Sequence, residues 1–313
     1  MPNVRNLKIS GYGSYLPDNT VTFGDHTRYR ITDDLTQLDM LCAAANQALA
    51  KAGITGADLD AVIGASAAGI QPIPCTAALV AEQIAPEGTA AAFDVNSTCT
   101  SMITAFDIAS RYLADGTYKT ILVTAGDVGT WFLNPGQKES FGLFSDCAVA
   151  FVLTTSDDPA QGIIASRQRT WPKHAHETEI RGGLSRLPAQ VYADSDPADY
   201  LFDMNGRSAL RSMIKVLPEF FGDFFEQTEL TVSDFDLVIP HQASPALKLA
   251  MSRIGIPEDK YIDWFQDIGN MVSSSVGYVL VKCLEQGRVK RGDTVVLCGT
   301  AAGLTANALA LRL

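Results

Sequence analysis

The sequence predicts an α/β fold made of two similar halves, and three observations point to it. Short apolar runs alternate with segments of helical periodicity, which is the pattern of strand–helix–strand units. An acidic residue leads into an apolar run twice, at 59–66 and at 235–241, and a helix-like segment precedes each run. A later pair of apolar runs, 120–127 and 293–299, repeats the correspondence. We therefore expect a duplicated chain with buried, mainly parallel sheets.

The individual elements follow from these patterns in order along the chain. They are a helix over 41–52, strands over 59–66 and 91–95, a helix over 102–113, strands over 120–127 and 148–153, a helix over 208–217, strands over 235–241 and 293–299, and an apolar run over 279–284. Ser-Asp-Asp-Pro follows the strand 148–153, so the halves should divide within 156–162, into residues 1–160 and 161–313. The segment 167–203 is the least regular part.

The composition is typical of an enzyme with a large core. Of the 313 residues, 47% are hydrophobic and 19% are charged. A net charge of −11 argues against a broad nucleic-acid surface and against an anionic membrane as a partner. The uncharged stretch 61–81 is interrupted by glycines and prolines, so we expect no membrane span there.

The six cysteines indicate a cytoplasmic protein with reduced thiols. They are scattered without metal-site spacing, and the N-terminus has no basic-then-apolar segment of the signal-peptide type. In the polar loop 171–177, His174 and His176 accompany Glu177, but no other ligand cluster is associated with them. We therefore expect both histidines to be solvated and no metal to be bound.

Cys99 lies between a predicted strand, 91–95, and a predicted helix. The apolar residues from Met102 to Leu113 recur at three- and four-residue spacing, so the helix begins at or just after the cysteine. The free N–H groups and the dipole of a helix N-terminus favour negative charge and are expected to lower the pKa of this thiol. Cys99 is therefore a candidate nucleophile, with a small buried core residue as the alternative.

His241 is the candidate partner of that thiol. It is the one histidine of four that follows an apolar strand, 237–239, at the strand end where ligands collect in α/β sheets. The turn after it opens a helix, with Ser244 as the expected N-cap and Pro245 as the first helical residue. A hydrogen-bonded structural histidine is the alternative.

A third polar site surrounds Asn270, which follows Gly269. Glycine permits a close backbone approach, and the asparagine amide offers two donors to a carbonyl or enolate oxygen. An ordinary Gly-Asn turn before the next helix is the alternative.

Finally, 297–305 is a strand that enters a turn of small residues, whose backbone N–H groups suit either an oxyanion hole or close chain packing.

Together these motifs resemble the thiolase-fold condensing enzymes, and most of all 3-oxoacyl-(acyl-carrier-protein) synthase III. The resemblance rests on Ser-Thr-Cys99-Thr-Ser, Pro-His241-Gln-Ala, Gly-Asn270 and the Ala-Gly-Leu-Thr of 302–305, in the family's order. Supporting segments are 11–17, 143–146 and 204–207. It extends from Lys8 to the C-terminus and implies a thiolase-like fold, in which the two halves form a layered α-β-α-β-α sandwich.

The resemblance implies a decarboxylative Claisen condensation. Cys99 would take the acyl group of an acyl thioester, and His241 and Asn270 would bind the carbonyl of a malonyl thioester. Loss of CO₂ leaves an enolate, which attacks the acyl group and gives a 3-oxoacyl product in fatty acid or polyketide-type biosynthesis. The backbone N–H groups of Cys99 and Ala302 would form the oxyanion hole. The resemblance implies no cofactor and no metal. It does imply a homodimer.

The resemblance also assigns residues along the path of the substrate. Ile73 stands where a phenylalanine commonly caps the acyl pocket, and the smaller side chain would admit a longer or branched acyl chain. Gly206, Ala243 and Ser244 correspond to pantetheine-binding positions. The basic residues expected to dock an acidic acyl carrier protein are Arg207, Arg211, Lys215, Lys248 and Arg253.

The acyl donor remains open between coenzyme A and a carrier protein. The stretch between Pro17 and Leu41 lacks the tryptophan and the arginine that usually grip the coenzyme A nucleotide. Arg28, Arg30 and Trp171 are candidates to replace them.

Three other functions compete with condensation. An acyltransferase would pass the acyl group from Cys99 to an alcohol or amine, and such relatives often carry aspartate in place of Asn270. Non-decarboxylative condensation needs a carboxylate base near Cys99, for which Glu82 is a candidate. A non-catalytic subunit of a heterodimeric synthase is disfavoured by the intact Cys99, His241 and Asn270.

Overall fold

Two five-stranded sheets form the framework of the protein, whose residues 4–313 are described by a computed structural model. The first sheet has the order β2-β8-β7-β5-β6 and the second β1-β9-β14-β13-β12. The strands of the first sheet are β2 (Lys8–Tyr15), β5 (Ala61–Gly64), β6 (Ala91–Asp94), β7 (Thr120–Asp127) and β8 (Cys147–Thr154). Those of the second are β1 (Arg5–Asn6), β9 (Gly162–Thr170), β12 (Leu237–Pro240), β13 (Thr294–Ala301) and β14 (Thr305–Arg312).

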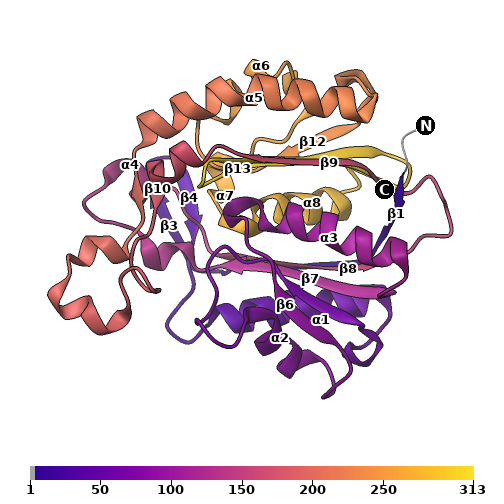
Figure 1. Ribbon diagram of the computed structural model, residues 1–313, viewed down its shortest axis with the longest axis horizontal. Coiled ribbons are helices and arrows are strands. Elements are labelled where there is room, and N and C mark those ends of the chain that lie inside the picture. Colours follow the sequence, from indigo (N-terminus) through magenta and orange to yellow (C-terminus); the bar gives the residue numbers. More distant parts are fainter. Residues whose placement is uncertain (1–3) are drawn as a thin grey trace.

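Helices separate and cover the sheets, so that the molecule has five layers (Figure 1). One pair of helices covers the outer face of the first sheet, one pair lies between the sheets, and one pair covers the outer face of the second. In that order the pairs are α1 (Gln37–Ala52) with α2 (Thr76–Ile84), α3 (Ser101–Asp115) with α8 (Ser275–Glu285), and α5 (Gly206–Thr228) with α6 (Leu247–Arg253). The predicted layered α/β sandwich is confirmed.

Shorter elements gather at one end of the sandwich, on the left of Figure 1. They are the hairpin β3 (Thr20–Phe23) and β4 (His26–Tyr29), the pair β10 (Thr178–Glu179) and β11 (Asp203–Met204), and the helices α4 (Lys138–Phe141) and α7 (Phe265–Ile268). The segment 167–203 was expected to be irregular. Its first residues, up to Thr170, belong to strand β9. The rest consists mainly of 3₁₀ turns, the first of which is η4 (Pro172–Glu177).

The two sheets repeat each other, as the duplicated sequence predicts. The order β2-β8-β7-β5 in the first corresponds to β9-β14-β13-β12 in the second. In each of these sets one pair is parallel, β5 with β7 and β12 with β13, and the other pairs are antiparallel. The expectation of mainly parallel sheets is therefore wrong. Residues 302–304 are all that joins β13 to β14, and a connection this short permits only an antiparallel pair.

The chain passes from the first sheet to the second between β8 and β9, within the range 156–162 expected from the sequence. One segment departs from this order. β1 pairs with β9 in the second sheet, with Arg5 opposite Ile163. The division into domains at residue 160 stays a prediction, and one strand from before that residue, β1, belongs to the second sheet.

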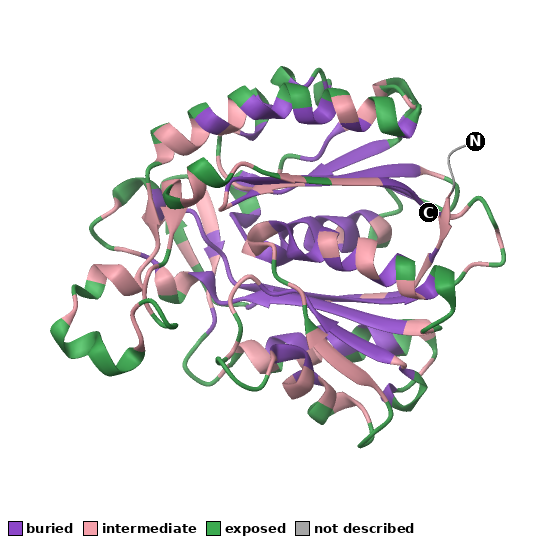
Figure 2. Ribbon diagram, in the orientation of Figure 1, coloured by how far each residue is buried: buried purple, intermediate pink, exposed green. Residues whose placement is uncertain are grey.

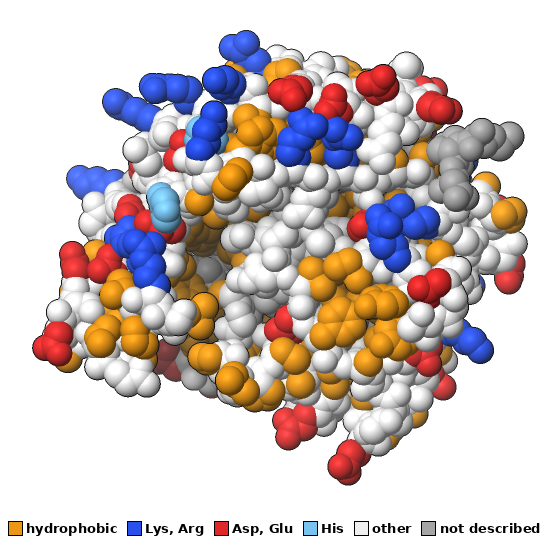
Figure 3. Space-filling model, viewed as in Figure 1, with side chains coloured by type: hydrophobic (Ala, Val, Ile, Leu, Met, Phe, Trp, Pro, Cys, Tyr) orange, Lys and Arg blue, Asp and Glu red, His pale blue; other side chains and the backbone are white. Residues whose placement is uncertain are grey.

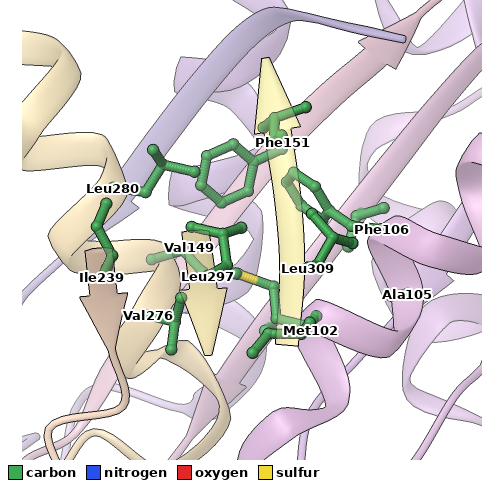
Figure 4. Packing of buried hydrophobic residues seen from close by; sticks show 14 of the residues in the cluster. Met102, Ala105, Phe106, Val149, Phe151, Ile239, Val276, Leu280, Leu297 and Leu309 are labelled. Atoms are coloured by element: carbon green, nitrogen blue, oxygen red, sulfur yellow. The ribbon is translucent and has the colours of Figure 1, made fainter. Parts of the chain in front are cut away.

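The middle layer is the main core of the molecule. Figure 4 shows Met102 and Phe106 of α3 among side chains from both sheets, including Phe151, Leu297 and Leu309. The rings of Phe106 and Phe151 pack edge to face with centroids 5.2 Å apart. In Figure 2 most strands of the two sheets and the central helix α8 are drawn as buried. Because both sheets contribute to this cluster, the two halves share one core.

Within the described range 4–313, no helix combines the length and the apolar character that crossing a membrane requires.

Candidate active site

Cys99 lies where β6 leads into α3, as the sequence predicts. A single 3₁₀ turn, η2 (Thr98–Thr100), connects them, and α3 begins at Ser101. Thr98 has a φ of 56°, in the left-handed region that β-branched residues avoid. Its backbone N–H donates a hydrogen bond to Asn96 Oδ1 at 2.8 Å, which holds this turn. The strained turn presents the thiol at the N-terminal end of the helix.

Burial governs the ionisation of the Cys99 thiol. It raises the pKa of Cys99 to about 12, and the carboxylate of Asp127 acts in the same direction. The backbone N–H groups of Cys99 and Ala302 hydrogen-bond to the sulfur and lower the pKa, but by less. The expected low pKa at the helix N-terminus is therefore wrong, and the thiol of the free protein is neutral. These two N–H groups are the ones expected to form the oxyanion hole.

His241 leaves the end of β12 in a firmly anchored turn. Its backbone N–H donates to Cys298 O of the neighbouring strand at 2.8 Å. The buried side chain of Gln242 donates to Ile262 O at 3.0 Å and accepts from Trp264 N at 2.7 Å. These bonds fix the backbone on both sides of the imidazole, so its position is set before any ligand enters.

The His241 imidazole is itself buried and neutral. Burial lowers the pKa of His241 to about 4, and within residues 4–313 its Nδ1 has no hydrogen-bond partner. Gly299 allows the ring this position, because a Cβ on Gly299 would lie 2.7 Å from His241 Cβ.

The helix after the histidine starts later than expected. Ala246, not Ser244, is the N-cap of α6, because residues 244–247 first form a turn closed by Leu247 N donating to Ser244 O.

Asn270 presents its amide from the loop after α7. Its Nδ2 donates one hydrogen to Ala243 O at 3.1 Å, and its Oδ1 accepts from Val272 N at 2.9 Å. One N–H of the amide is left for a ligand oxygen. Gly269 precedes it with φ 70° and ψ −168°, a conformation that is essentially restricted to glycine.

Arg28 supports this loop from the interior. Its side chain is fully buried and donates to Gly142 O at 2.7 Å and to Gln266 O at 3.0 Å, with the guanidinium 4.7 Å from the centre of the Phe265 ring. Burial lowers the pKa of Arg28 to about 10. Arg28 is thus a structural residue, and the expectation that it could grip a coenzyme A nucleotide at the surface is wrong.

One cavity of about 640 Å³ brings the predicted residues together. Cys99, His241 and Asn270 all line it, although they come from three separate loops. The residues assigned by resemblance that also line it are Gly206, Arg207, Ala243, Ser244 and Ala302. Its apolar lining includes Phe132, Leu143, Phe144, Phe202, Met204, Leu210 and Met213. An elongated, largely apolar chain could therefore reach the sulfur.

Asp127 is a cavity residue that the sequence interpretation missed. It ends β7, and its buried carboxylate accepts from Ala68 N at 2.9 Å and from both the backbone N–H and the hydroxyl of Ser273. It thereby joins the loop after β5 to the loop after Asn270. Burial raises the pKa of Asp127. The signal in the sequence is a charged residue that closes the otherwise apolar run 120–127 at a strand end.

Ile73 and Glu82 do not line the cavity of their own chain. Ile73 is 85% exposed in the loop before α2, so the expected capping of the acyl pocket is wrong within one chain. The N–H groups of Thr76 and Ala77 donate to the carboxylate of Asp94 at 2.8 Å, which holds the start of α2 at the edge strand β6. The loop carrying Ile73 is therefore directed to the edge of the sheet. Glu82 is exposed on α2 and is not a base beside Cys99.

The basic residues expected to dock a carrier protein are all exposed. Arg207 is at the start of α5 and at the cavity wall, with Arg211 and Lys215 further along the helix. Lys248 pairs with Glu258 at 2.6 Å, which offsets its positive charge. Figure 3 shows basic side chains along the edge of the molecule over α5 and α6.

The two histidines of η4 have different environments. His176 is 75% exposed, as expected, but the His174 side chain is only 17% exposed and lines the cavity. The expectation of a solvated surface is therefore wrong for His174. The reason is that η4 packs against α5, which no local sequence pattern predicts.

Two family models match the chain. The model described as 3-oxoacyl-[acyl-carrier-protein (ACP)] synthase III matches residues 93–172, and the model of its C-terminal part matches residues 225–313. Together they include Cys99, His241 and Asn270.

Individual proteins are similar over the whole chain. A beta-ketoacyl-[acyl-carrier-protein] synthase III of Symbiobacterium thermophilum is 31% identical, over 99% of this chain and 98% of the relative. One of Clostridium perfringens is 28% identical, over 99% of this chain and all of the relative. The crystal structure of 3-oxoacyl-[acyl-carrier-protein] synthase III from Aquifex aeolicus has a TM-score of 0.85 and 27% identity, over 98% of this chain and 100% of that one.

Proposed function

Because this chain belongs to the 3-oxoacyl-[acyl-carrier-protein] synthase III family, we propose that it condenses an acyl thioester with a malonyl thioester. The observation that carries the proposal is the convergence of Cys99, His241 and Asn270 on one cavity. The cavity supplies a nucleophile, a neutral imidazole and an amide donor, which are the groups that a decarboxylative condensation needs.

In the first half-reaction Cys99 takes the acyl group. The sulfur attacks the thioester carbonyl, the carbon–sulfur bond to the carrier breaks, and the thiol proton passes by way of His241 to the leaving thiolate. The neutral, buried imidazole suits this transfer, because a group with a pKa of about 4 is present as the free base at neutral pH. The oxyanion formed on the way faces the backbone N–H groups of Cys99 and Ala302, which already hydrogen-bond to the sulfur in the free protein.

In the second half-reaction the malonyl thioester carbonyl accepts hydrogen bonds from His241 and from the free N–H of Asn270. Its carboxylate leaves as CO₂, and the electron pair of the broken bond forms an enolate that these donors stabilise. The enolate carbon attacks the acyl group, and the bond to Cys99 breaks. The thiolate that remains takes up a proton, and the 3-oxoacyl thioester is released.

The substrates are proposed to be thioesters of coenzyme A or of an acyl carrier protein, with no resident cofactor or metal, in the cytoplasm. Every step above uses only N–H donors, an imidazole and a thiol. Exposed Arg207 lines the cavity, and Arg211 and Lys215 follow it along α5 as further positive charges that would attract an acidic carrier protein; Arg253 is an additional exposed candidate on α6. The ion pair of Lys248 with Glu258 makes Lys248 the weakest of the five docking candidates.

A homodimer formed through β6 is proposed as the functional unit. β6 is one of the two edge strands of its sheet, and no strand within residues 4–313 pairs with its outer side. Partly buried apolar side chains lie on it and on the adjacent helix, including Phe93, Val95 and Tyr112, and Figure 3 shows apolar side chains gathered over β6 and α3. An unprotected apolar edge of this kind favours pairing with a second copy about a twofold axis. Ile73, next to this edge, would then reach the acyl pocket of the other subunit.

Intact-protein mass spectrometry tests the reaction. The protein is incubated with a panel of acyl-coenzyme A and acyl-carrier-protein thioesters, and Cys99→Ala is treated in parallel. We expect the mass of one acyl group on the native protein and none on the variant. Addition of malonyl-carrier protein should restore the unmodified mass and release CO₂ and a 3-oxoacyl product.

The alternatives give different outcomes in the same experiment. Discharge of the acyl group by an alcohol or amine, but not by the malonyl thioester, would replace condensation by acyl transfer. Light scattering on the purified protein tests the dimer, and a monomer at micromolar concentration would contradict it.

A further inference from the structure

A second polar pair lies in the wall of the cavity, apart from the three residues assigned to the reaction. His174 and Glu177 both line the cavity, and their side chains are only 17% and 18% exposed. They come from η4, which follows the last strand residue of β9 and packs on α5. Neither residue has a role in the condensation described above.

The imidazole of His174 is held in one orientation. Its Nδ1 lies 2.8 Å from Glu177 Oε1 and 3.1 Å from Ser212 Oγ. The same carboxylate oxygen accepts from the hydroxyls of Ser208 and Ser212, each at 2.8 Å. A carboxylate on Nδ1 favours the tautomer with hydrogen on that nitrogen, so Nε2 is left as an acceptor for a ligand.

The carboxylate is ionised in this arrangement. Burial opposes its ionisation, but the hydrogen bonds from Ser208, Ser212 and His174 outweigh burial and lower the pKa of Glu177. Its second oxygen, Oε2, is buried and has no partner within the described part of the chain. Burying a charged carboxylate with one oxygen unsatisfied costs free energy, which is more typical of a group that serves a binding site than of a purely structural contact.

We propose that His174, oriented by Glu177, accepts a hydrogen bond from a hydroxyl or amide N–H group of the thioester substrate. The proposal rests on the proposed function, because that function makes a thioester the occupant of the cavity. His174 is then a specificity-determining residue, since its ring nitrogen is a side-chain acceptor held in one orientation in a cavity whose lining as a whole is largely apolar.

The donor group could belong to either part of the substrate. Beyond its cysteamine amide, a pantetheine arm carries a second amide N–H and the hydroxyls of its pantoyl unit, and an acyl chain can carry a hydroxyl; these are the candidate donors. The chemistry recognised by Nε2 is the same in both cases, so the experiment separates the two sources by changing one part of the thioester at a time.

The experiment measures the rate of Cys99 acylation at low substrate concentration by intact-protein mass spectrometry. The substrates are a straight-chain acyl group and its 3-hydroxy counterpart, each as the pantetheine thioester and as the N-acetylcysteamine thioester. N-acetylcysteamine lacks both hydroxyls and the outer amide of pantetheine and keeps only the amide next to the thioester. The variants are His174→Ala and Glu177→Gln, with His176→Ala as the control, because His176 makes a matching contact with Glu179 but is 75% exposed.

Loss of one such hydrogen bond lowers the apparent second-order rate constant by about three- to tenfold. If the donor is one of the arm groups that N-acetylcysteamine lacks, His174→Ala loses this factor with the pantetheine thioesters and keeps the native rate with the N-acetylcysteamine thioesters. If it is in the acyl chain, the loss follows the 3-hydroxy group with both arms. Glu177→Gln should show the same selectivity with a smaller loss, and His176→Ala should match the native protein.

Two results would overturn the inference. One is a His174→Ala protein with native rates on all four thioesters, and the other is an equal loss on all four, which indicates a structural role only. Both leave the proposed function intact, because the native protein is still acylated at Cys99. Failure of the native protein to be acylated by any thioester would contradict the proposed function instead.

Discussion

At the scale of single residues, the site depends on groups that are kept neutral by burial. The Cys99 thiol and the His241 imidazole are both uncharged in the free protein, because burial raises the pKa of the first and lowers that of the second. Negative charge therefore develops only during the reaction, next to hydrogen-bond donors that are already in position. Preorganised donors in a site with little water stabilise such charge far better than water does.

The pH dependence of stability tests the environment of His241. Its pKa is about 4 when folded and near 6.5 when unfolded, so protonation favours the unfolded chain. Its contribution to stability is complete above pH 6.5 and is lost as the pH falls toward 4. We expect the melting temperature of the native protein to drop more over this range than that of His241→Asn. Parallel melting curves for the two proteins would contradict a buried, neutral imidazole.

Asn270 should matter for the second half-reaction and not for the first. Replacing it by Ala removes the amide donor to the malonyl carbonyl, and we expect condensation to fall by at least about 100-fold. Acylation of Cys99 should stay close to the native rate. Asn270→Asp is the matched variant, because its carboxylate can still accept from Val272 N but cannot donate. Equal loss of both half-reactions would contradict this division of roles.

At the scale of elements, the ends of strands and helices position each reactive group. Cys99 follows the end of β6, His241 the end of β12, and Asn270 the end of α7. Each adjoining loop is tied down by buried polar bonds, such as those of Asp127 to Ser273 and of Arg28 to Gly142. Buried hydrogen bonds of this kind keep the loops rigid, so the three groups stay aligned.

Gly269→Ala tests the loop that carries Asn270. A Cβ at Gly269 would lie 2.5 Å from Arg28 Cδ, in a conformation that alanine rarely adopts. We expect a loss of about 2–3 kcal/mol in the free energy of unfolding and a strong loss of condensation. Gly255→Ala is the control, because Gly255 also has a positive φ but has open space around its Cα. It should cost about 1–2 kcal/mol and leave activity unchanged. Equal effects of both substitutions on condensation would contradict the role given to the loop.

At the scale of the whole molecule, the two halves are joined by the helical layer between their sheets. α3 comes from the first half and α8 from the second, and both contribute to one apolar cluster that contacts both sheets. The reactive residues lie at one end of this layer, at the N-terminal ends of these helices or beside them. The site therefore exists only when both halves are folded and docked.

Phe106→Ala tests this shared core. The substitution leaves a cavity between the sheets and should cost about 3–5 kcal/mol of unfolding free energy. We expect a single shifted transition, with circular dichroism and tryptophan fluorescence changing together during denaturation. Leu249→Ala on the exposed face of α6 is the control and should change stability by less than about 0.5 kcal/mol. Separate transitions in the two signals would show that the halves unfold independently.

The sequence alone determined the features that depend on local patterns. The alternation of apolar runs and helical segments, and its repetition, predicted an α/β fold of two similar halves, and the resemblance to the family implied the layered sandwich. The placement of Cys99 between β6 and α3 and of His241 after β12 followed from residue spacing and strand ends. The motifs around them were specific enough to indicate the family. These features could be predicted because periodicity reports which face of an element is buried.

Only the tertiary structure decided what depends on packing between distant segments. The sheets are mixed, because β8 and β14 return beside β7 and β13. Asp127 joins the cavity, Ile73 faces outward, and His174 enters the cavity wall because η4 packs on α5. The raised pKa of Cys99 could not be predicted from the sequence either. Burial of the thiol raises this pKa by more than the backbone N–H groups lower it, and the sequence shows only that a helix begins there. Burial, charge and proximity at this site arise from segments that meet only when the two sheets enclose the central helices.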